Sequence, residues 1–461
     1  MKNAILTSIL ALSSLHIFGQ SATKFTKEAV REDLKYLYES LEDAHYSLYA
    51  YVTKQDFDLA YERVQNSITK ESLNLLDATV LFQQLISMVN NGHTEISFPG
   101  QSYAEYAYAG GTLFPLEIAF ENNRSFIRKN WSEDTGIHAG SEILGINGAS
   151  MTEILAKIYP QISAERQYFK HAKIELYSFP RLYWLVFGKQ NDFEIEILSD
   201  GVVKKHTIKA VDVIEGFEAR RTEVLNAEKI LKFYGPTAYL NPGNFSGDEI
   251  KYQAFIDSSF VKIKEHYCKN LIIDLRNNAG GDDSFSDYLV SYFADKPFKW
   301  NSNFALKTSK FLKEHTRKHN DTTSVYWQNV LKHEDGEIYT YDFEAYLPQP
   351  EQKRFAGKVY ALVNRQSHSQ SAVTAAQIQD YDFGAIVGEE TGDYPSLYAS
   401  IFQYLLPNTG IPVTVSKGYI VRVNGSTKEE GVVPDIFIKD HLLDETDEIL
   451  EGLLKKIDGK P

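Results

Sequence analysis

Two short aliphatic runs in the second half of the chain constrain its fold more than any other feature. They are Leu271–Leu275 and Val359–Val363, and each is followed by turn residues and then by a helical pattern. A nearly unbroken apolar strand is typical of a parallel sheet covered on both faces. Strands that alternate with helices indicate βαβ units. We therefore predict an α/β core over residues 225–445. The further strands expected in it are 237–240 and 385–387, and the helices are 248–264, 284–293 and 370–379.

Helical periodicity precedes this core. Val30, Leu34 and Leu41 recur at helix spacing, and another helix is expected at 75–88, before an Asn-Asn-Gly stop. The chain has 461 residues, which is too many for a single hydrophobic core. We expect a small N-terminal helical bundle over residues 22–100.

A pattern of strands and turns follows over residues 105–215. Its most specific run is Gly140–Gly148, which reads GSEILGING and leads into a helical stretch at 151–158. The run resembles the strand and turn of PDZ domains, G-D-x-I-L-x-I-N-G. The resemblance implies a module that binds an extended peptide at a sheet edge. An ordinary strand-turn-helix without a ligand is the alternative.

The first 21 residues are typical of a secretory signal peptide. Lys2 gives a basic start, residues 4–18 are mostly apolar, and small residues follow for cleavage. The apolar run is too short to span a bilayer comfortably, although an uncleaved anchor or a buried helix is the alternative. We expect an exported protein, periplasmic or extracellular, with no transmembrane segment in the mature chain.

Charge and cysteine content exclude some functions. The net charge of −14 argues against nucleic acid as a partner, because phosphate binding needs a basic surface. Cys268 is the only cysteine, which excludes an intramolecular disulfide and a multi-cysteine zinc site. A polar insertion is expected at 297–357. Its His315 and His319 have metal-ligand spacing but lie in a basic run that would repel a cation.

Residue types suited to acyl transfer follow both aliphatic runs. Gly280 and Gly281 come shortly after the first strand, where backbone N–H groups can point into a ligand crevice and form an oxyanion hole. Ser369 stands where a helix begins after the second strand. The helix dipole there stabilises developing negative charge, although a serine at that position is also a common N-cap.

Four motifs in order resemble the C-terminal processing (tail-specific) peptidase family. Residues 271–281 (LIIDLRNNAGG) resemble its L-I-I-D-L-R-x-N-x-G-G signature, and residues 367–372 (SHSQSA) its S-x-S-A-S-E nucleophile segment. Residues 388–391 match the start of its G-E-x-T-x-G turn, and residues 430–435 its G-V-x-P-D ending, whereas Asp393 replaces the closing glycine of the turn. The resemblance implies a multi-domain α/β fold: a ClpP/crotonase-like βαβ protease core with an N-terminal helical bundle and a PDZ-like domain.

The resemblance also implies site residues. Ser369 falls on the nucleophile, and the backbone N–H groups of Gln370 and of Gly280 or Gly281 on the oxyanion hole. Lysine-dependent members carry a base lysine just after the G-E-x-T-x-G turn, but here the nearest downstream lysine is Lys417.

A second branch of the family, which includes tricorn-like proteases, pairs the serine with histidine and glutamate. Residues 91–94 (NGHT) resemble its D-G-H-T motif, which assigns the general base to His93. Glu429 or Glu430 lies where related enzymes place the glutamate that orients the histidine. His368 adjoins Ser369 and is expected to point elsewhere. A structural role for His93 and a solvated position for the two glutamates are the alternatives.

These observations predict a secreted serine-type endopeptidase that hydrolyses peptide bonds by acyl transfer near the C-terminal ends of unfolded proteins or peptides. We expect no cofactor and no metal. The alternative is a non-catalytic peptide- or lipid-binding protein on the same fold, because interphotoreceptor retinoid-binding protein shares this core without serving as a protease. The oligomeric state cannot be read from the sequence.

Overall fold

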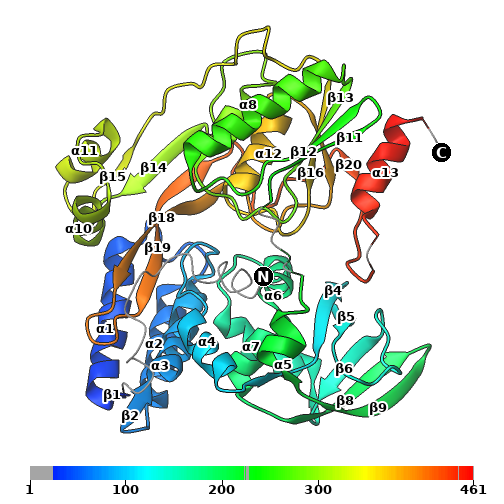
Figure 1. The fold of residues 1–461 in the computed structure, drawn as a ribbon. Helices are drawn as coiled ribbons and strands as arrows, with labels where there is room; N and C mark the ends of the chain where they lie inside the picture. Colours follow the sequence, from blue (N-terminus) through cyan, green and yellow to red (C-terminus); the bar gives the residue numbers. More distant parts are fainter. Residues whose placement is uncertain (1–23, 223, 225–227, 445, 460–461) are drawn as a thin grey trace.

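The structure is a computed structural model that describes residues 24–222, 224, 228–444 and 446–459. Figure 1 shows an α/β half above a second half, which is built from the N-terminal helices and another sheet. The signal-peptide prediction falls on residues 1–21, which lie outside the described residues. Within the described part, no helix combines the length and the apolar character that a membrane span requires.

A six-stranded sheet forms the centre of the α/β half, in the order β11-β12-β13-β16-β17-β20. The strands from β12 to β20 run parallel, and β11 pairs antiparallel at one edge. The predicted α/β core with βαβ units is therefore confirmed. The strands are β11 (Ile230–Tyr234), β12 (Thr237–Asn241), β13 (Asn270–Asp274), β16 (Lys358–Val363), β17 (Ala385–Gly388) and β20 (Ile436–Phe437).

Helices cover both faces of this sheet, which explains why β13 and β16 are apolar almost throughout. Leu271 and Ile273 belong to the cluster packed under α8, α9 and α12, whereas Ile272 packs on the other face with Ile449 of α13. Asp248 caps the N-terminus of α8 by accepting from the N–H of Lys251. The helices are α8 (Glu249–Glu265), α9 (Asp283–Val290), α12 (Gln370–Asp380) and α13 (Glu448–Ile457).

The N-terminal helices share their core with a second sheet of the α/β half. Val30, Leu34 and Phe82 belong to the same buried cluster as Phe402 and Val415, which lie on the long strands β18 and β19. Two short strands that the sequence pattern did not indicate pair beside the helices. The elements are β1 (Lys24–Thr26), α1 (Lys27–Ala44), α2 (Lys54–Ser67), β2 (Ser72–Asn74), α3 (Leu75–Ile86), the 3-10 turn η1 (Ser87–Val89) and α4 (Gly100–Tyr108).

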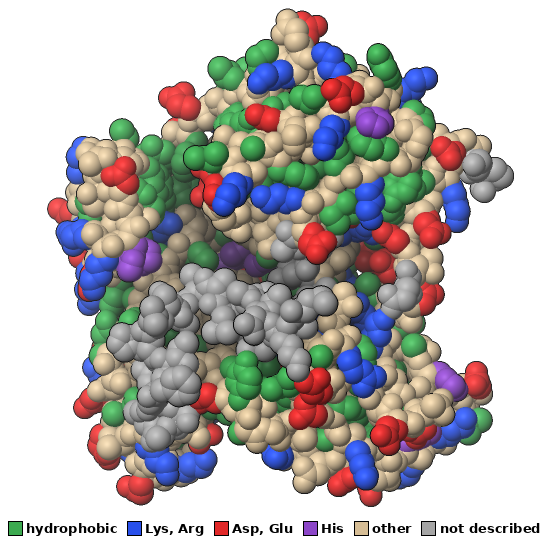
Figure 2. Space-filling view, viewed as in Figure 1, with side chains coloured by type: hydrophobic (Ala, Val, Ile, Leu, Met, Phe, Trp, Pro, Cys, Tyr) green, Lys and Arg blue, Asp and Glu red, His purple; other side chains and the backbone are tan. Residues whose placement is uncertain are grey.

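The segment expected as a polar insertion is ordered and belongs to this second sheet, which runs in the order β15-β14-β19-β18. Lys310 and Lys313 of its basic helix pair with Asp43 and Asp335, and Figure 2 shows acidic and basic side chains interspersed over the visible face. The elements are β14 (Asn303–Lys307), α10 (Lys310–His319), α11 (Val325–Lys332), β15 (Ile338–Thr340), β18 (Leu397–Leu405) and β19 (Pro412–Val421).

The middle of the chain forms an antiparallel sheet, β4-β5-β6-β8-β9, with β7 paired to β6. Asn147 (φ 52°) and Gly148 (φ 77°) make the turn after β6, and a capping box of Ser150 and Glu153 starts α5. The elements are β3 (Thr112–Leu113), β4 (Leu116–Glu121), β5 (Arg124–Asn130), β6 (Glu142–Ile146), β7 (Ala149–Ser150), α5 (Met151–Ile158), η2 (Tyr159–Gln161), α6 (Gln167–Tyr177), α7 (Phe179–Phe187), β8 (Asp192–Ser199), β9 (Val202–Lys209), β10 (Val211–Asp212) and the π-helical turn η3 (Val213–Glu218).

Candidate active site

Ser369 occupies the N-cap of α12 in a backbone conformation that serine rarely adopts, with φ 53° and ψ −127°. The neighbouring hydroxyls of Ser367 and Ser371 both donate to the carbonyl of Leu275, at 2.8 and 3.1 Å, which ties this turn to the end of β13. A strained strand-to-helix turn is the device that presents the serine of nucleophile elbows. Ser369 itself is half-buried rather than enclosed.

The two glycines after β13 lie at different places around this turn. A Cβ on Gly280 (φ 83°) would lie 2.7 Å from the Gln370 nitrogen, so this glycine packs directly against the start of α12. A Cβ on Gly281 (φ 138°) would instead meet the carbonyl of Phe245. The Gly280 N–H donates to Asn278 Oδ1 at 2.8 Å. Because the Gly280 N–H is already bonded, the predicted oxyanion donors that remain are the N–H groups of Gly281 and Gln370.

His93 reaches the same place from the N-terminal half of the chain. Its ring stacks on that of His368, with centroids 4.6 Å apart and an interplanar angle of 19°. Its Nε2 lies 3.8 Å from Asp393 Oδ2. Both nitrogens of His93 are buried, and neither has a hydrogen-bond partner among the described residues. An imidazole without a partner in a buried position has both nitrogens available for chemistry.

Asp393 joins these groups, and sequence reasoning missed it as a site residue. Its Oδ2 accepts the N–H of Ser369 at 2.8 Å and lies 3.4 Å from His368 Nε2, and its side chain is fully buried. The structure thus brings Ser369 and His93 together around one carboxyl. It also places His368 in the cluster, although the sequence predicted that this ring points elsewhere. Asp393 stands where the family turn has a glycine, so its signal was a departure from the motif.

Glu165 holds the loop that carries His93. Its Oε1 accepts the Gly92 N–H at 2.7 Å and the Asn91 Nδ2 at 3.0 Å. Asn91 also donates to the Tyr398 carbonyl at 3.0 Å. These contacts explain why asparagine replaces the aspartate of the D-G-H-T motif, since an aspartate here would face the Glu165 carboxylate without a proton to donate.

The residue after Glu165 holds the loop that carries Asp393. The guanidinium of Arg166 donates to the Thr391 carbonyl at 2.6 Å, to the Gly392 carbonyl at 3.2 Å and to the Glu390 carboxylate at 2.7 Å. Two adjacent residues before α6 therefore position the two loops whose side chains meet at Ser369.

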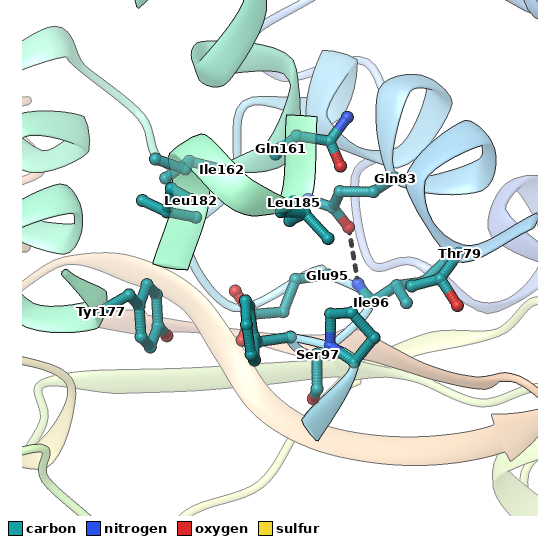
Figure 3. A pocket seen from close by; sticks show the side chains of 12 residues that line it. Thr79, Gln83, Glu95, Ile96, Ser97, Gln161, Ile162, Tyr177, Leu182 and Leu185 are labelled. Atoms are coloured by element: carbon teal, nitrogen blue, oxygen red, sulfur yellow. Dashed lines mark hydrogen bonds between the residues drawn. The ribbon is translucent and has the colours of Figure 1, made fainter. Parts of the chain in front are cut away.

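Lys173 of α6 is a buried cation that acts on this cluster. Its Nζ donates to the Gly92 carbonyl at 2.8 Å and pairs with Glu95 Oε2 at 3.3 Å. Glu95 also lines the pocket drawn in Figure 3, where Gln83 Oε1 accepts the N–H of Ile96 at 2.9 Å. That pocket therefore borders the segment after His93 without including Ser369.

Burial governs the protonation of the cluster. It lowers the pKa of His93 to about 3, with Lys173 adding to the effect, and it holds the pKa of His368 well below the ordinary histidine value. Burial and the nearby Glu165 raise the pKa of Asp393 to about 8. Both imidazoles are therefore neutral near pH 7, and the carboxyl group of Asp393 carries a proton.

The remaining predicted residues lie apart from this cluster. Glu430 pairs with Lys428 at 3.7 Å, and Glu429 is exposed, so the structure shows neither carboxylate hydrogen-bonded to His93. Lys417 Nζ donates to the Ser400 carbonyl at 2.8 Å and to its hydroxyl at 2.6 Å, and not to Ser369.

Known proteins resemble the chain in both sequence and structure. Residues 236–438 match the model of Peptidase family S41. The Tail-specific protease of Haemophilus influenzae (strain ATCC 51907 / DSM 11121 / KW20 / Rd) is 28% identical over 184 residues, which make up 38% of this chain and 21% of that protein. The aligned segment therefore spans about a fifth of the length of this relative.

Solved structures match over nearly the whole chain. Mature CPAF is 16% identical with a TM-score of 0.62, covering 89% of this chain and 92% of CPAF. Mature CPAF complexed with lactacystin is 16% identical with a TM-score of 0.63, covering 94% of this chain and 97% of that one. These likenesses establish the multi-domain α/β fold.

Proposed function

Because residues 236–438 form a domain of peptidase family S41, we propose that this chain is a serine peptidase with Ser369 as nucleophile and His93 as general base. The observation that carries the proposal is the meeting of three segments at one carboxyl. Asp393 accepts the N–H of Ser369 and lies 3.8 Å from the imidazole of His93.

The reaction follows from these positions. His93 is neutral, so one of its nitrogens can accept the proton of Ser369 Oγ while that oxygen attacks the scissile carbonyl carbon. The imidazolium then returns this proton to the leaving amine as the peptide C–N bond breaks. Water activated by the same imidazole hydrolyses the acyl-enzyme. Asp393 lies 3.8 Å from the imidazole and is the group placed to orient His93, the role that the sequence assigned to Glu429 or Glu430.

The oxyanion hole is assigned to the N–H groups of Gln370 and Gly281. Gln370 is the first residue of α12, where backbone N–H groups have no acceptor within the helix. The dipole of α12 adds to the stabilisation of negative charge at this point. Gly280 contributes by close packing, since its own N–H is bonded to Asn278.

We also propose the substrate class and the location that the sequence predicts. The substrate is an unfolded protein or peptide, which is cleaved near its C-terminal end. The enzyme is an endopeptidase exported to the periplasm or the cell exterior. We infer a division into a helical part at 22–100, a PDZ-like domain at 105–215 and a ClpP/crotonase-like core at 225–445. An edge of the β4-β9 sheet is the proposed binding place for an extended peptide.

The test compares the purified full chain with Ser369→Ala, His93→Ala and Lys417→Met. Cleavage of β-casein, a protein without stable structure, is followed by mass spectrometry. We expect Ser369→Ala and His93→Ala to lower turnover by about 10³-fold or more, because these residues act as a unit. Lys417→Met should retain activity, since Lys417 donates its hydrogen bonds to Ser400 rather than to Ser369.

Labelling with a fluorophosphonate separates catalysis from binding. We expect it to modify the wild-type chain and not Ser369→Ala, because only an activated serine reacts. Cleavage by Ser369→Ala would refute the nucleophile. Peptide binding without any labelling or cleavage would favour the non-catalytic binder on this fold.

A further inference from the structure

The cluster beside Ser369 contains the donor set of a metal site. His93, His368 and Asp393 each offer one ligand atom, and these three atoms lie within 4.8 Å of one another. The side chains of His93 and Asp393 are 6% and 0% exposed. His93 Nε2 and His368 Nε2 both lack a hydrogen-bond partner within the described ranges. Buried imidazole nitrogens without partners are unusual, because burial of a polar atom normally requires a hydrogen bond.

The distances suit a small divalent ion. Zn²⁺ binds imidazole nitrogen and carboxylate oxygen at about 2.0–2.2 Å in tetrahedral geometry, so its ligand atoms lie roughly 3.4 Å apart. Asp393 Oδ2 is 3.4 Å from His368 Nε2 and 3.8 Å from His93 Nε2. The ligand atoms of the two stacked imidazoles lie within 4.8 Å of one another, so a bound ion would turn the two rings out of their stack toward a common point. Larger oxygen-seeking ions such as Ca²⁺ need more ligands and mainly oxygen donors.

The surroundings support this donor set. The backbone N–H of His368 donates to the Asn278 carbonyl at 3.1 Å, which holds the segment that carries this ring against the turn after β13. The 23% exposed side chain of His368 provides a route for an ion from solvent.

The charges nearby also permit a cation. Lys173 would repel it, but this ammonium pairs with Glu95 at 3.3 Å. Glu165 is anchored to the same loop as His93, and Asp393 faces both imidazoles. Glu95 therefore offsets the charge of the Lys173 ammonium before an ion reaches Asp393.

We propose that His93, His368 and Asp393 bind a Zn²⁺ ion that reversibly blocks the active site. The binding is independent of the proposed function, whereas the block rests on it. A metal bound to His93 takes the lone pair that would accept the proton of Ser369, so the serine stays a hydroxyl. A metal-loaded chain is therefore inactive, and a chelator activates it rather than inhibiting it.

Isothermal titration of the full chain with Zn²⁺ tests the site. We expect one ion per wild-type chain, and binding weakened by about tenfold or more in His368→Ala and in Asp393→Asn. Ser369→Ala should bind as the wild type does, because the serine hydroxyl is not among the ligands. Circular dichroism checks folding, and His93→Gln serves as a replacement if either ligand variant fails to fold. Cobalt in place of zinc should give the visible absorption of a tetrahedral site.

A second cluster on the surface supplies the matched control. His441, Asp444 and Glu448 also group three ligand atoms, and Asp444 is exposed. Zinc binding that persists in the His368 and Asp393 variants but disappears in His441→Ala would overturn the proposal. Zinc binding by a chain without peptidase activity would refute the proposed function and leave the metal site intact. An active peptidase that zinc neither binds nor inhibits would refute the metal site alone.

Discussion

Gly280→Ala is the sharpest perturbation of the turn that presents Ser369. An alanine there has a left-handed φ of 83°, which costs about 1–2 kcal/mol for a residue with a side chain. Its Cβ would also lie 2.7 Å from the Gln370 nitrogen, the His368 carbonyl and the Ser369 Cβ. These are backbone and first side-chain atoms, which cannot rotate away. Relief of such overpacking costs about 1–3 kcal/mol more.

Activity should fall further than stability, because the start of α12 must move away from the new methyl group. A displacement of about 1 Å at a catalytic group can lower turnover by roughly 10²-fold. Gly235→Ala is the control, since it has a similar left-handed φ of 56° but no atom within 4 Å of the new Cβ.

Urea denaturation and a peptidase assay on both variants separate the two effects. Gly280→Ala should lose about 2–5 kcal/mol of unfolding free energy and most of its activity. Gly235→Ala should lose only the conformational part and stay active. Equal losses in the two variants, or a fully active Gly280→Ala, would refute the close packing of this glycine against the nucleophile turn.

Two further predictions concern residues around the site. Asn91→Asp should lower the free energy of unfolding by about 3–5 kcal/mol in urea denaturation, because two donated hydrogen bonds are lost and a carboxylate faces Glu165. The control Asn123→Asp, on an exposed turn, should cost little, and similar losses in both variants would contradict this reasoning. Burial lowers the pKa of Lys417 to about 7, whereas a lysine in the unfolded chain titrates near ~10.4. Between these two pH values the unfolded chain binds one more proton than the folded chain does. The free energy of unfolding should therefore rise by up to about 4 kcal/mol from pH 7 to pH 10, measured relative to Lys417→Met. Parallel pH profiles of the two proteins would argue against a buried neutral amine beside Ser400.

Local signals explain which elements could be predicted from the sequence. The helix expected at 151–158 is α5, because Ser150 and Glu153 form a capping box at its start. The aliphatic runs predicted β13 and β16 to within one residue at each end. The family suggested by the four motifs is also the one whose model the core matches.

Long-range pairing explains what the sequence did not indicate. The pairing of β14 with β19 joins residues more than 100 positions apart, and no local pattern predicts it. The polar segment containing β14 therefore resembled a loop, although Phe304 and Leu306 are buried in the core shared with the N-terminal helices. The three-residue strands β1 and β2 are too short for alternation to be visible.

The site was predictable only where a motif marked it. Ser369, His93 and the glycine pair follow from motifs, whereas Asp393 stands where the motif expects glycine. An acidic residue shortly after the buried strand β17 was the available signal. Glu165 and Lys173 carry no motif, since their role comes from hydrogen bonds to the backbone of Gly92 that form only in the folded chain.

The adjacent pair Glu165 and Arg166 has a consequence for how the molecule can be divided. The segment from 236 to 438 contains the nucleophile turn and Asp393 but not His93, nor the pair that fastens the loops of His93 and Asp393. A fragment cut at residue 236 would keep a serine without its proton acceptor. In this protein the unit that functions, and the unit that a graft or a truncation must preserve, is larger than the unit that sequence similarity outlines.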